Sequence, residues 1–197
     1  MNLIYDFETL SQNAFNGVIV NVAALHFDPD RFNDDPYDYM ELVGDAKFIK
    51  FNISEQVEKY GRKIQSSTLE WWKKQSKEAQ SQLKPNKLDK SIESLYNFMF
   101  DEMKIEDMKF IYTRGNSFDP VFFDSVCYML DKPKPKNWWA IRDTRSTLDG
   151  MLWGSGIKDN FIPDGLDELF VGHNPMHDIA MDVCRLQYVS RVINGKN

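Results

Sequence analysis

The strongest constraint on the fold comes from the segment Asn2 to Leu10, which reads Asn-Leu-Ile-Tyr-Asp-Phe-Glu-Thr-Leu. Aromatic and branched apolar residues dominate it, which is typical of a buried strand. Asp6 and Glu8 are two positions apart, and because successive strand side chains point to opposite faces, both carboxylates share one face. Buried neighbouring carboxylates repel each other unless a divalent cation lies between them. An edge strand with both acids in water is the alternative interpretation.

Length and composition predict one globular domain over residues 1–197, because 42% of the residues are hydrophobic and 14% are aromatic. Cys127 and Cys184 each lie in an apolar helical pattern, so we expect reduced core cysteines and a cytoplasmic protein. The first strand begins at once, without the basic and apolar regions of a signal peptide, and no apolar run approaches membrane-spanning length. We therefore expect a soluble, untargeted protein.

The formal net charge is −6 and the pI is about 5.1. This balance argues against broad electrostatic wrapping of duplex nucleic acid, which needs a large positive surface. It is compatible with a short contact to a chain end. A site built from several carboxylates would also account for part of the negative charge.

The remaining patterns alternate between strands and helices, which predicts an α/β domain. We expect a strand at 18–27 that forms a hairpin with the first, a loop at 31–39 and a strand at about 47–53. Further on, we expect helices from Ser67 or Thr68 and at 89–103, strands at 108–113 and 138–142, and helices at 119–130, at 144–153 and from Asp178.

A third acid, Asp119, follows the predicted strand at 108–113 and opens the next helix. Ligand sites of open α/β sheets gather at such carboxyl ends of strands. An Asp before Pro120 is also what a helix N-cap looks like, so a purely structural role is the alternative.

The last predicted helix carries a fourth acid, Asp182, on or beside its apolar face. A buried carboxylate needs a metal or a cationic partner, and a salt bridge to an arginine would also satisfy it. His177 precedes this helix. If Asp178 is the N-cap, His177 lies outside the helix on a loop, where it can approach a site at the sheet edge.

Three segments together resemble the ordered motifs of the DEDDh, or DnaQ-like, 3'-5' exonucleases: Asp6-Phe7-Glu8-Thr9, Asn116-Ser117-Phe118-Asp119, and His177 with Asp182. The motifs span nearly the whole chain. Residues 67–76 also resemble a segment of the phage exonuclease A (DexA) group and a related bacterial exoribonuclease. The resemblance implies a ribonuclease H-like fold, a central mixed β-sheet flanked by helices, in a bacterial or phage-infected cytoplasm.

The same resemblance implies a site and a reaction. Asp6, Glu8, Asp119 and Asp182 would hold two divalent ions, Mg²⁺ or Mn²⁺, that clamp the scissile phosphate, and His177 would be the general base. The reaction would remove nucleoside 5'-monophosphates from the 3' end of single-stranded nucleic acid. DNA is the first choice of substrate, and RNA is the alternative.

His173 and Asp178 have the same spacing as His177 and Asp182, so spacing alone accepts either pair. Pro175 interrupts the stretch after His173, whereas helix-compatible residues follow His177. We therefore assign the motif to His177 and Asp182.

The resemblance also implies that Thr9 and Leu10, which follow the acids, contact the terminal nucleotide of the substrate. Phe118 and Trp71 could stack on bases, and packing is the alternative for Trp71. The basic residues Lys73, Lys74, Arg114 and Arg142 could meet phosphates, or only be solvated. Two other functions stay open: a catalytically silent binding or assembly module of this fold, and a phosphodiesterase for small nucleotides. A homodimer is compatible with the sequence, but no residue pattern argues for one.

Overall fold

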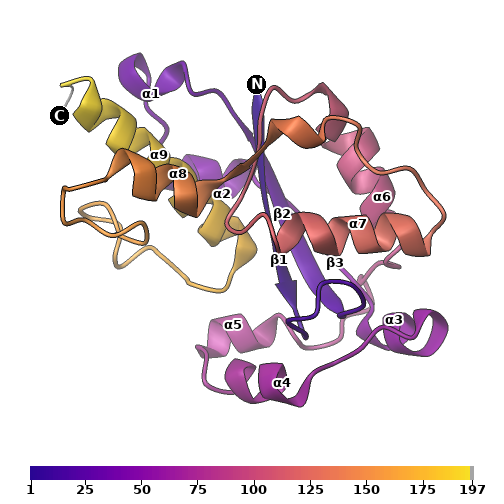
Figure 1. Cartoon of the computed structure of the whole chain (residues 1–197). Helices are drawn as coiled ribbons and strands as arrows, with labels where there is room; N and C mark the ends of the chain where they lie inside the picture. Colours follow the sequence, from indigo (N-terminus) through magenta and orange to yellow (C-terminus); the bar gives the residue numbers. More distant parts are fainter. Residues whose placement is uncertain (196–197) are drawn as a thin grey trace.

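A computed structural model, which describes residues 1–195, contains a five-stranded sheet in the order β3-β2-β1-β4-β5 (Figure 1). The strands are β1 (Asn2–Thr9), β2 (Ile19–Phe27), β3 (Lys47–Lys50), β4 (Ile111–Thr113) and β5 (Ile141–Asp143). β1, β2 and β3 pair antiparallel, whereas β4 and β5 continue the sheet in parallel with β1. This arrangement confirms the predicted mixed sheet and the predicted hairpin of the first two strands.

Helices cover both faces of the sheet and one end of it. The α-helices of the described residues are α1 (Arg31–Asp34), α2 (Tyr39–Asp45), α3 (Ile53–Tyr60), α4 (Ser66–Trp72), α5 (Lys77–Ser81), α6 (Ser94–Asn97), α7 (Asp119–Met129), α8 (Thr144–Met151) and α9 (Pro175–Ile193). Figure 1 shows α1, α2, α8 and α9 on one side of the sheet and α6 and α7 on the other. Helices α3, α4 and α5 lie beyond the carboxyl end of β1.

The alternation of β1 divides the core into two clusters. Leu3, Tyr5 and Phe7 pack on the side of α6 and α7. Ile4 packs on the other side, in a cluster that contains Ile179 and Val183 of α9. Asp6 and Glu8 follow Ile4 at steps of two, so they lie on the α9 face of the strand.

Some predicted boundaries were wrong because short capping motifs were overlooked. The predicted loop at 31–39 contains α1 and the start of α2, which Asp38 and Glu41 begin with a reciprocal capping box. The strand predicted at 47–53 ends at Lys50, because Asn52 caps α3. The helix predicted from Ser67 or Thr68 begins at Ser66 and ends at Trp72.

Other segments are shorter or differently wound than predicted. The helix predicted at 89–103 consists of α6 and a π-helical turn, Phe98–Glu102. The strand predicted at 138–142 begins with a 3-10 turn, Trp138–Ala140, before β5. Both cysteines are free and buried, as predicted. Within residues 1–195, no helix combines the length and apolar character that a membrane span requires.

The start of the last helix differs from its prediction in a way that matters for the site. Helix α9 begins at Pro175, and the side chain of Asn174 accepts a hydrogen bond from the backbone N–H of Met176 at 3.2 Å. Proline suits the first helical position, where no intrahelical bond from its nitrogen is needed. Asp178 is therefore not the N-cap, and His177 lies inside the first turn rather than on a loop.

Candidate active site

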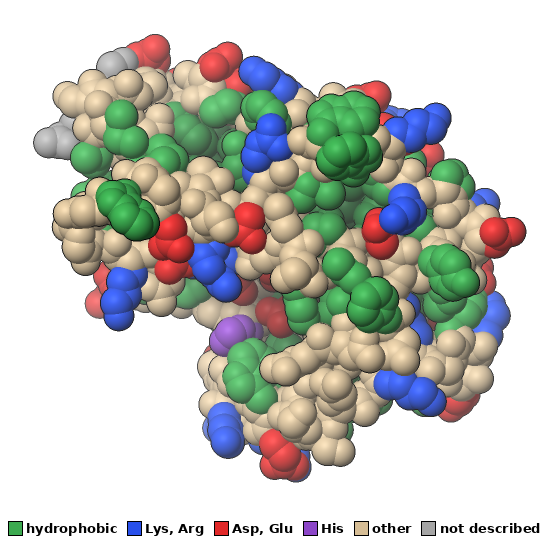
Figure 2. All heavy atoms as spheres, viewed as in Figure 1, with side chains coloured by type: hydrophobic (Ala, Val, Ile, Leu, Met, Phe, Trp, Pro, Cys, Tyr) green, Lys and Arg blue, Asp and Glu red, His purple; other side chains and the backbone are tan. Residues whose placement is uncertain are grey.

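An acidic cleft of about 600 Å³ opens at the carboxyl ends of β1 and β4. Figure 2 shows a hollow on this face, with acidic side chains at its floor and a histidine at its edge. The titratable side chains that line the cleft are Asp6, Glu8, Arg114, Asp119, Arg145, His173, Asp178 and Arg185. The predicted acids Asp6, Glu8 and Asp119 are therefore brought together.

Asp119 is held against β1 by a backbone contact. It is the first residue of α7, next to the cap residue Phe118, and it is 3% exposed. Its Oδ1 accepts a hydrogen bond from the backbone N–H of Phe7 at 3.2 Å. Phe7 stands between Asp6 and Glu8, so this bond fixes the third carboxylate beside the other two.

Two residues just before and at the start of α9 complete the cluster. Glu8, His173 and Asp178 each place one potential ligand atom within 4.8 Å of the others. Asp178 lies in the first turn of α9, and His173 precedes the cap Asn174 with a left-handed backbone, φ 60°. The structure thus puts His173 and Asp178, rather than His177 and Asp182, at the cleft.

Burial and mutual repulsion raise the pKa values of the clustered acids. The pKa values of Asp6 and Glu8 are raised well above their usual range, first by burial and then by neighbouring carboxylates. Burial also raises the pKa values of Asp119 and Asp178 to about 7. Among the ion pairs of the described residues, none involves these four acids.

This donor set fits a hard divalent cation. Two buried carboxylates, Glu8 and Asp119, and two partly buried ones, Asp6 and Asp178, have no paired arginine or lysine among the described residues. They offer oxygen ligands and an excess of negative charge, which Mg²⁺ and Mn²⁺ bind well. The imidazole of His173 lies at the edge of the same group.

Without a bound cation, the protein should lose stability as pH rises. The folded-state pKa values of Asp119 and Asp178, about 7, exceed the unfolded value, so their favourable contribution is complete at low pH and is lost as pH rises through the folded pKa. Each group changes the unfolding free energy by up to about 1.4 kcal/mol per pH unit. Thermal unfolding in a chelator should show a midpoint that falls between about pH 4 and 7, from the unfolded to the folded pKa, and Mn²⁺ should restore it most above pH 7. A midpoint that rises over this range contradicts the expectation.

His177 is turned away from the carboxylates. Its Nδ1 lies 2.7 Å from the hydroxyl of Tyr39, a residue of α2 that is 2% exposed. Burial lowers the pKa of His177. Because α9 begins two residues before His177, its imidazole packs toward α2 rather than toward β1.

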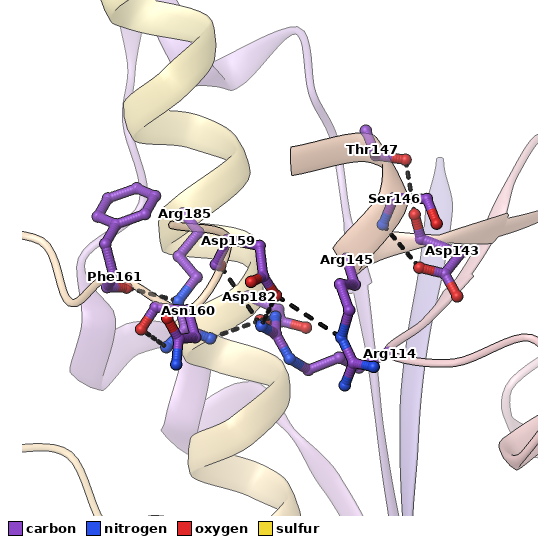
Figure 3. A network of polar contacts seen from close by, with 10 residues as sticks. All are labelled: Arg114, Asp143, Arg145, Ser146, Thr147, Asp159, Asn160, Phe161, Asp182 and Arg185. Carbon is purple, nitrogen blue, oxygen red and sulfur yellow. Dashed lines mark hydrogen bonds and ion pairs between the residues drawn. The ribbon is translucent and has the colours of Figure 1, made fainter. Parts of the chain in front are cut away.

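The carboxylate of Asp182 forms ion pairs with two arginines. Its Oδ1 accepts hydrogen bonds from Arg114 Nη1 at 2.6 Å and from Arg185 Nη1 at 2.7 Å, as Figure 3 shows. Arg114 also pairs with Asp159, and Arg185 donates to the backbone carbonyl of Phe161 at 2.7 Å. Asp182 is buried as predicted, but the structure satisfies it by the salt bridge that the sequence had left open.

Replacing Asp182 by alanine should destabilise the fold by about 3–5 kcal/mol, because Arg185 would keep a buried charge without a carboxylate and Arg114 would keep only Asp159. Urea unfolding monitored by circular dichroism would measure this loss. Asp35→Ala is the matched control, since Asp35 pairs with Arg31 at the surface and its side chain is 77% exposed. That substitution should lower the free energy of unfolding by about 1 kcal/mol or less. Equal losses for both variants would show that the buried pairs are not special.

A second, more apolar pocket of about 430 Å³ adjoins the acidic cleft, and both are lined by Phe7, Glu8 and Phe118. The predicted substrate contacts Thr9, Trp71 and Phe118 line this pocket. Leu10 does not belong with them: it is 3% exposed and packs in the core beside Val18, Val20 and Trp72. The guanidinium of Arg114 is engaged by Asp159 and Asp182.

Two sequence features favour His177 and Asp182 over His173 and Asp178: Pro175 after His173, and the expected burial of Asp182. The first does not hold in the structure. Asn174 followed by Pro175 is a favourable N-cap and first helical position. That signal was available, and it places His173 just outside the helix and Asp178 in its first turn.

The sequence matches a protein family and a characterised relative. The family described as 3'-5' exoribonuclease Rv2179c-like domain matches residues 1–179. An exodeoxyribonuclease of Enterobacteria phage T4 is 30% identical in an alignment of 211 positions. The alignment covers 98% of this chain and 91% of the phage protein.

Two solved structures show the same fold at low sequence identity. The nuclease domain of 3'hExo, a DEDDh family member, is 13% identical with a TM-score of 0.52, covering 99% of this chain and 92% of that one. E. coli exonuclease I is 14% identical with a TM-score of 0.65, covering 97% of this chain. The match spans only 40% of the exonuclease I chain. The fold is therefore that of a DEDDh-family nuclease domain, as the sequence resemblance implied. The match over residues 1–179 and the phage relative show that the chain belongs to the family of 3'-5' exoribonuclease Rv2179c-like domains.

Proposed function

We propose that this chain, as one nuclease domain over residues 1–197, removes nucleoside 5'-monophosphates from the 3' end of single-stranded DNA. The last two residues of that domain lie outside the described part. The observation that carries the proposal is the convergence of four carboxylates, two of them buried and two partly buried, and one imidazole at a single cleft. Asp6, Glu8, Asp119 and Asp178 would hold two divalent cations, with Asp178 in the place first given to Asp182.

When bound, the two cations neutralise the charge of the scissile phosphate and orient it for in-line attack. His173 accepts a proton from the attacking water on a ring nitrogen. Burial lowers the pKa of His173, which favours the neutral imidazole that can take this proton. The water oxygen bonds to phosphorus, the bond from phosphorus to the 3' oxygen breaks, and a nucleoside 5'-monophosphate and a shortened strand result.

The pocket lined by Thr9, Trp71 and Phe118 suits the terminal nucleotide. It opens beside Glu8, so a nucleotide whose phosphate lies among the carboxylates can extend its sugar and base into it. Trp71 is 41% exposed and presents an aromatic ring on which a base can stack without regard to its identity. These contacts leave out Leu10, which is in the core.

The two sequence relatives point to different sugars. The phage relative is named an exodeoxyribonuclease, whereas the matching family is described as exoribonuclease-like. We favour DNA because the phage protein aligns with nearly the whole chain, and RNA is the second candidate. Such an enzyme would work in the cytoplasm of a bacterium or a phage-infected cell.

The test is digestion of single-stranded DNA and RNA oligomers of one sequence, labelled at either end, with Mg²⁺ or Mn²⁺. A 3'-5' exonuclease removes a 3' label at once and shortens a 5'-labelled strand stepwise. The sugar degraded faster decides between DNA and RNA. Asp6→Ala is the inactive control.

No digestion with either metal would overturn the proposal and favour a silent binding module of the same fold. Cleavage of mononucleotide esters but not of oligomers would instead identify a phosphodiesterase for small nucleotides.

A further inference from the structure

His173 lies in a long segment with little regular structure of its own. Residues 152–174, between α8 and α9, contain neither helix nor strand. Segments of that length need ties to the rest of the fold to hold a side chain in one place. His173 also has a left-handed backbone, φ 60°, which is unfavourable for a residue with a Cβ by about 1 kcal/mol or more.

The side chain of Gln82 bonds to the backbone of His173. Gln82, the residue that ends α5, donates a hydrogen bond from Nε2 to the carbonyl oxygen of His173 at 3.0 Å. At the other end of the same amide, Oε1 accepts a hydrogen bond from Nδ2 of Asn21 at 2.6 Å. Because one end donates and the other accepts, a flipped amide would lose both bonds.

Asn21 connects this amide to the strand that carries the acids. Asn21 is fully buried on β2 and is the direct partner of Glu8 in the antiparallel register. Directly opposed residues of neighbouring strands point to the same face of a sheet. The chain of contacts therefore runs from the neighbour of Glu8, through Gln82, to the backbone of His173, whose ring lies close to Glu8.

The segment that carries Gln82 is fixed to the end of β1 as well. Trp72 of α4 donates a hydrogen bond from Nε1 to the carbonyl oxygen of Thr9 at 2.9 Å. The ring of Trp71 packs edge-on against the His173 ring, with centroids 4.7 Å apart. Helix α4 thus contacts both the end of the acidic strand and the histidine segment, and Gln82, the C-cap of α5, connects that segment to β2.

We propose that Gln82 is a positioning residue for His173: its amide, oriented by Asn21, sets the place of the imidazole relative to the carboxylates of β1. This role rests on the proposed function, in which His173 is the general base. Gln82 touches neither substrate nor metal in this scheme and acts through the backbone carbonyl that it holds.

The test compares kcat and KM on a single-stranded oligomer for two substitutions of Gln82. Gln82→Glu keeps the shape and the acceptor for Asn21 but has no N–H to donate when ionised. Gln82→Ala removes both bonds. Both should lower kcat about 10- to 100-fold, the cost expected for misplacing a catalytic group by about 1 Å, and should change KM less than twofold.

Gln80→Ala is the matched control. Its amide donates to the backbone carbonyls of Lys73 and Gln75, within the same segment, and does not reach His173. This control should keep kcat within about twofold, because the general base stays in place.

A double-mutant cycle separates positioning from general damage to the fold. In a His173→Ala background, Gln82→Glu should lower the residual rate less than twofold, since no imidazole is left to position. An equal loss in both backgrounds, or an unchanged kcat in the single variants, would overturn the inference. Asn21→Leu provides a second variant, which acts from the other end of the amide and should show the same dependence on His173. An inactive wild-type protein would instead overturn the proposed function.

Discussion

Replacement of Asp6 by asparagine should reduce the rate of oligomer digestion about a thousandfold or more. Asp6 lines the acidic cleft, and its pKa is raised first by burial and then by Asp119, Glu8 and Asp178. Charge stabilisation by bound divalent cations is worth several kcal/mol, and each 1.4 kcal/mol, about one factor of ten, enters the rate directly. The rate at saturating substrate and Mg²⁺ or Mn²⁺ measures this effect.

The same variant should be more stable than the wild type when no cation is present. Asparagine keeps the size of the side chain but removes one of four mutually repelling charges. Thermal unfolding in a chelator at pH 8 should therefore show a higher midpoint, by about 2–5 °C. Asp124→Asn on α7 is the control, because Asp124 pairs with Lys134 at the surface and should change neither property. An Asp6→Asn enzyme that keeps more than a tenth of its activity would exclude a central role for this carboxylate.

The second large effect should separate the two histidines. His173→Ala should reduce kcat by about 10²–10⁴, the usual contribution of a general base. His177→Ala should leave kcat within about threefold, because its ring bonds to Tyr39 and does not line the acidic cleft. Each variant is the control of the other, since the same side chain is removed from positions four residues apart.

Single-turnover digestion at fixed enzyme excess would measure both rates without interference from product release. A larger loss for His177→Ala than for His173→Ala would contradict the structure and favour the assignment made from the sequence. Comparable losses in both would indicate that the contact of His177 with Tyr39 also controls the approach of α9 to the cleft.

The sequence was sufficient wherever a residue's role depended on local pattern. The alternation around Asp6 and Glu8 identified a buried strand with both acids on one face, and the strand-to-helix junction identified Asp119. The mixed sheet and the β1–β2 hairpin also followed from the pattern and the family resemblance.

The sequence was insufficient where two positions had equivalent local patterns. Asp178 and Asp182 are one helical turn apart on α9, so both belong to the same face and periodicity does not separate them. Only the tertiary structure distinguishes the two acids, because Arg114, which follows β4, donates a hydrogen bond to Asp182. The side chain of Leu10 is a similar case, because only its packing against Trp72 shows that it points into the core.

The paired arginines around Asp182 have a consequence for the mechanics of the active site. Four residues of helix correspond to an axial distance of about 6 Å, so Asp182 and Asp178 are rigidly spaced along α9. Arg114 and the backbone of Phe161 fix the turn that contains Asp182, and sliding α9 by one residue would displace Asp178 by about 1.5 Å. The network of Figure 3 therefore fixes the position of α9 along its own axis, and with it the distance that the carboxylate of Asp178 reaches into the cleft.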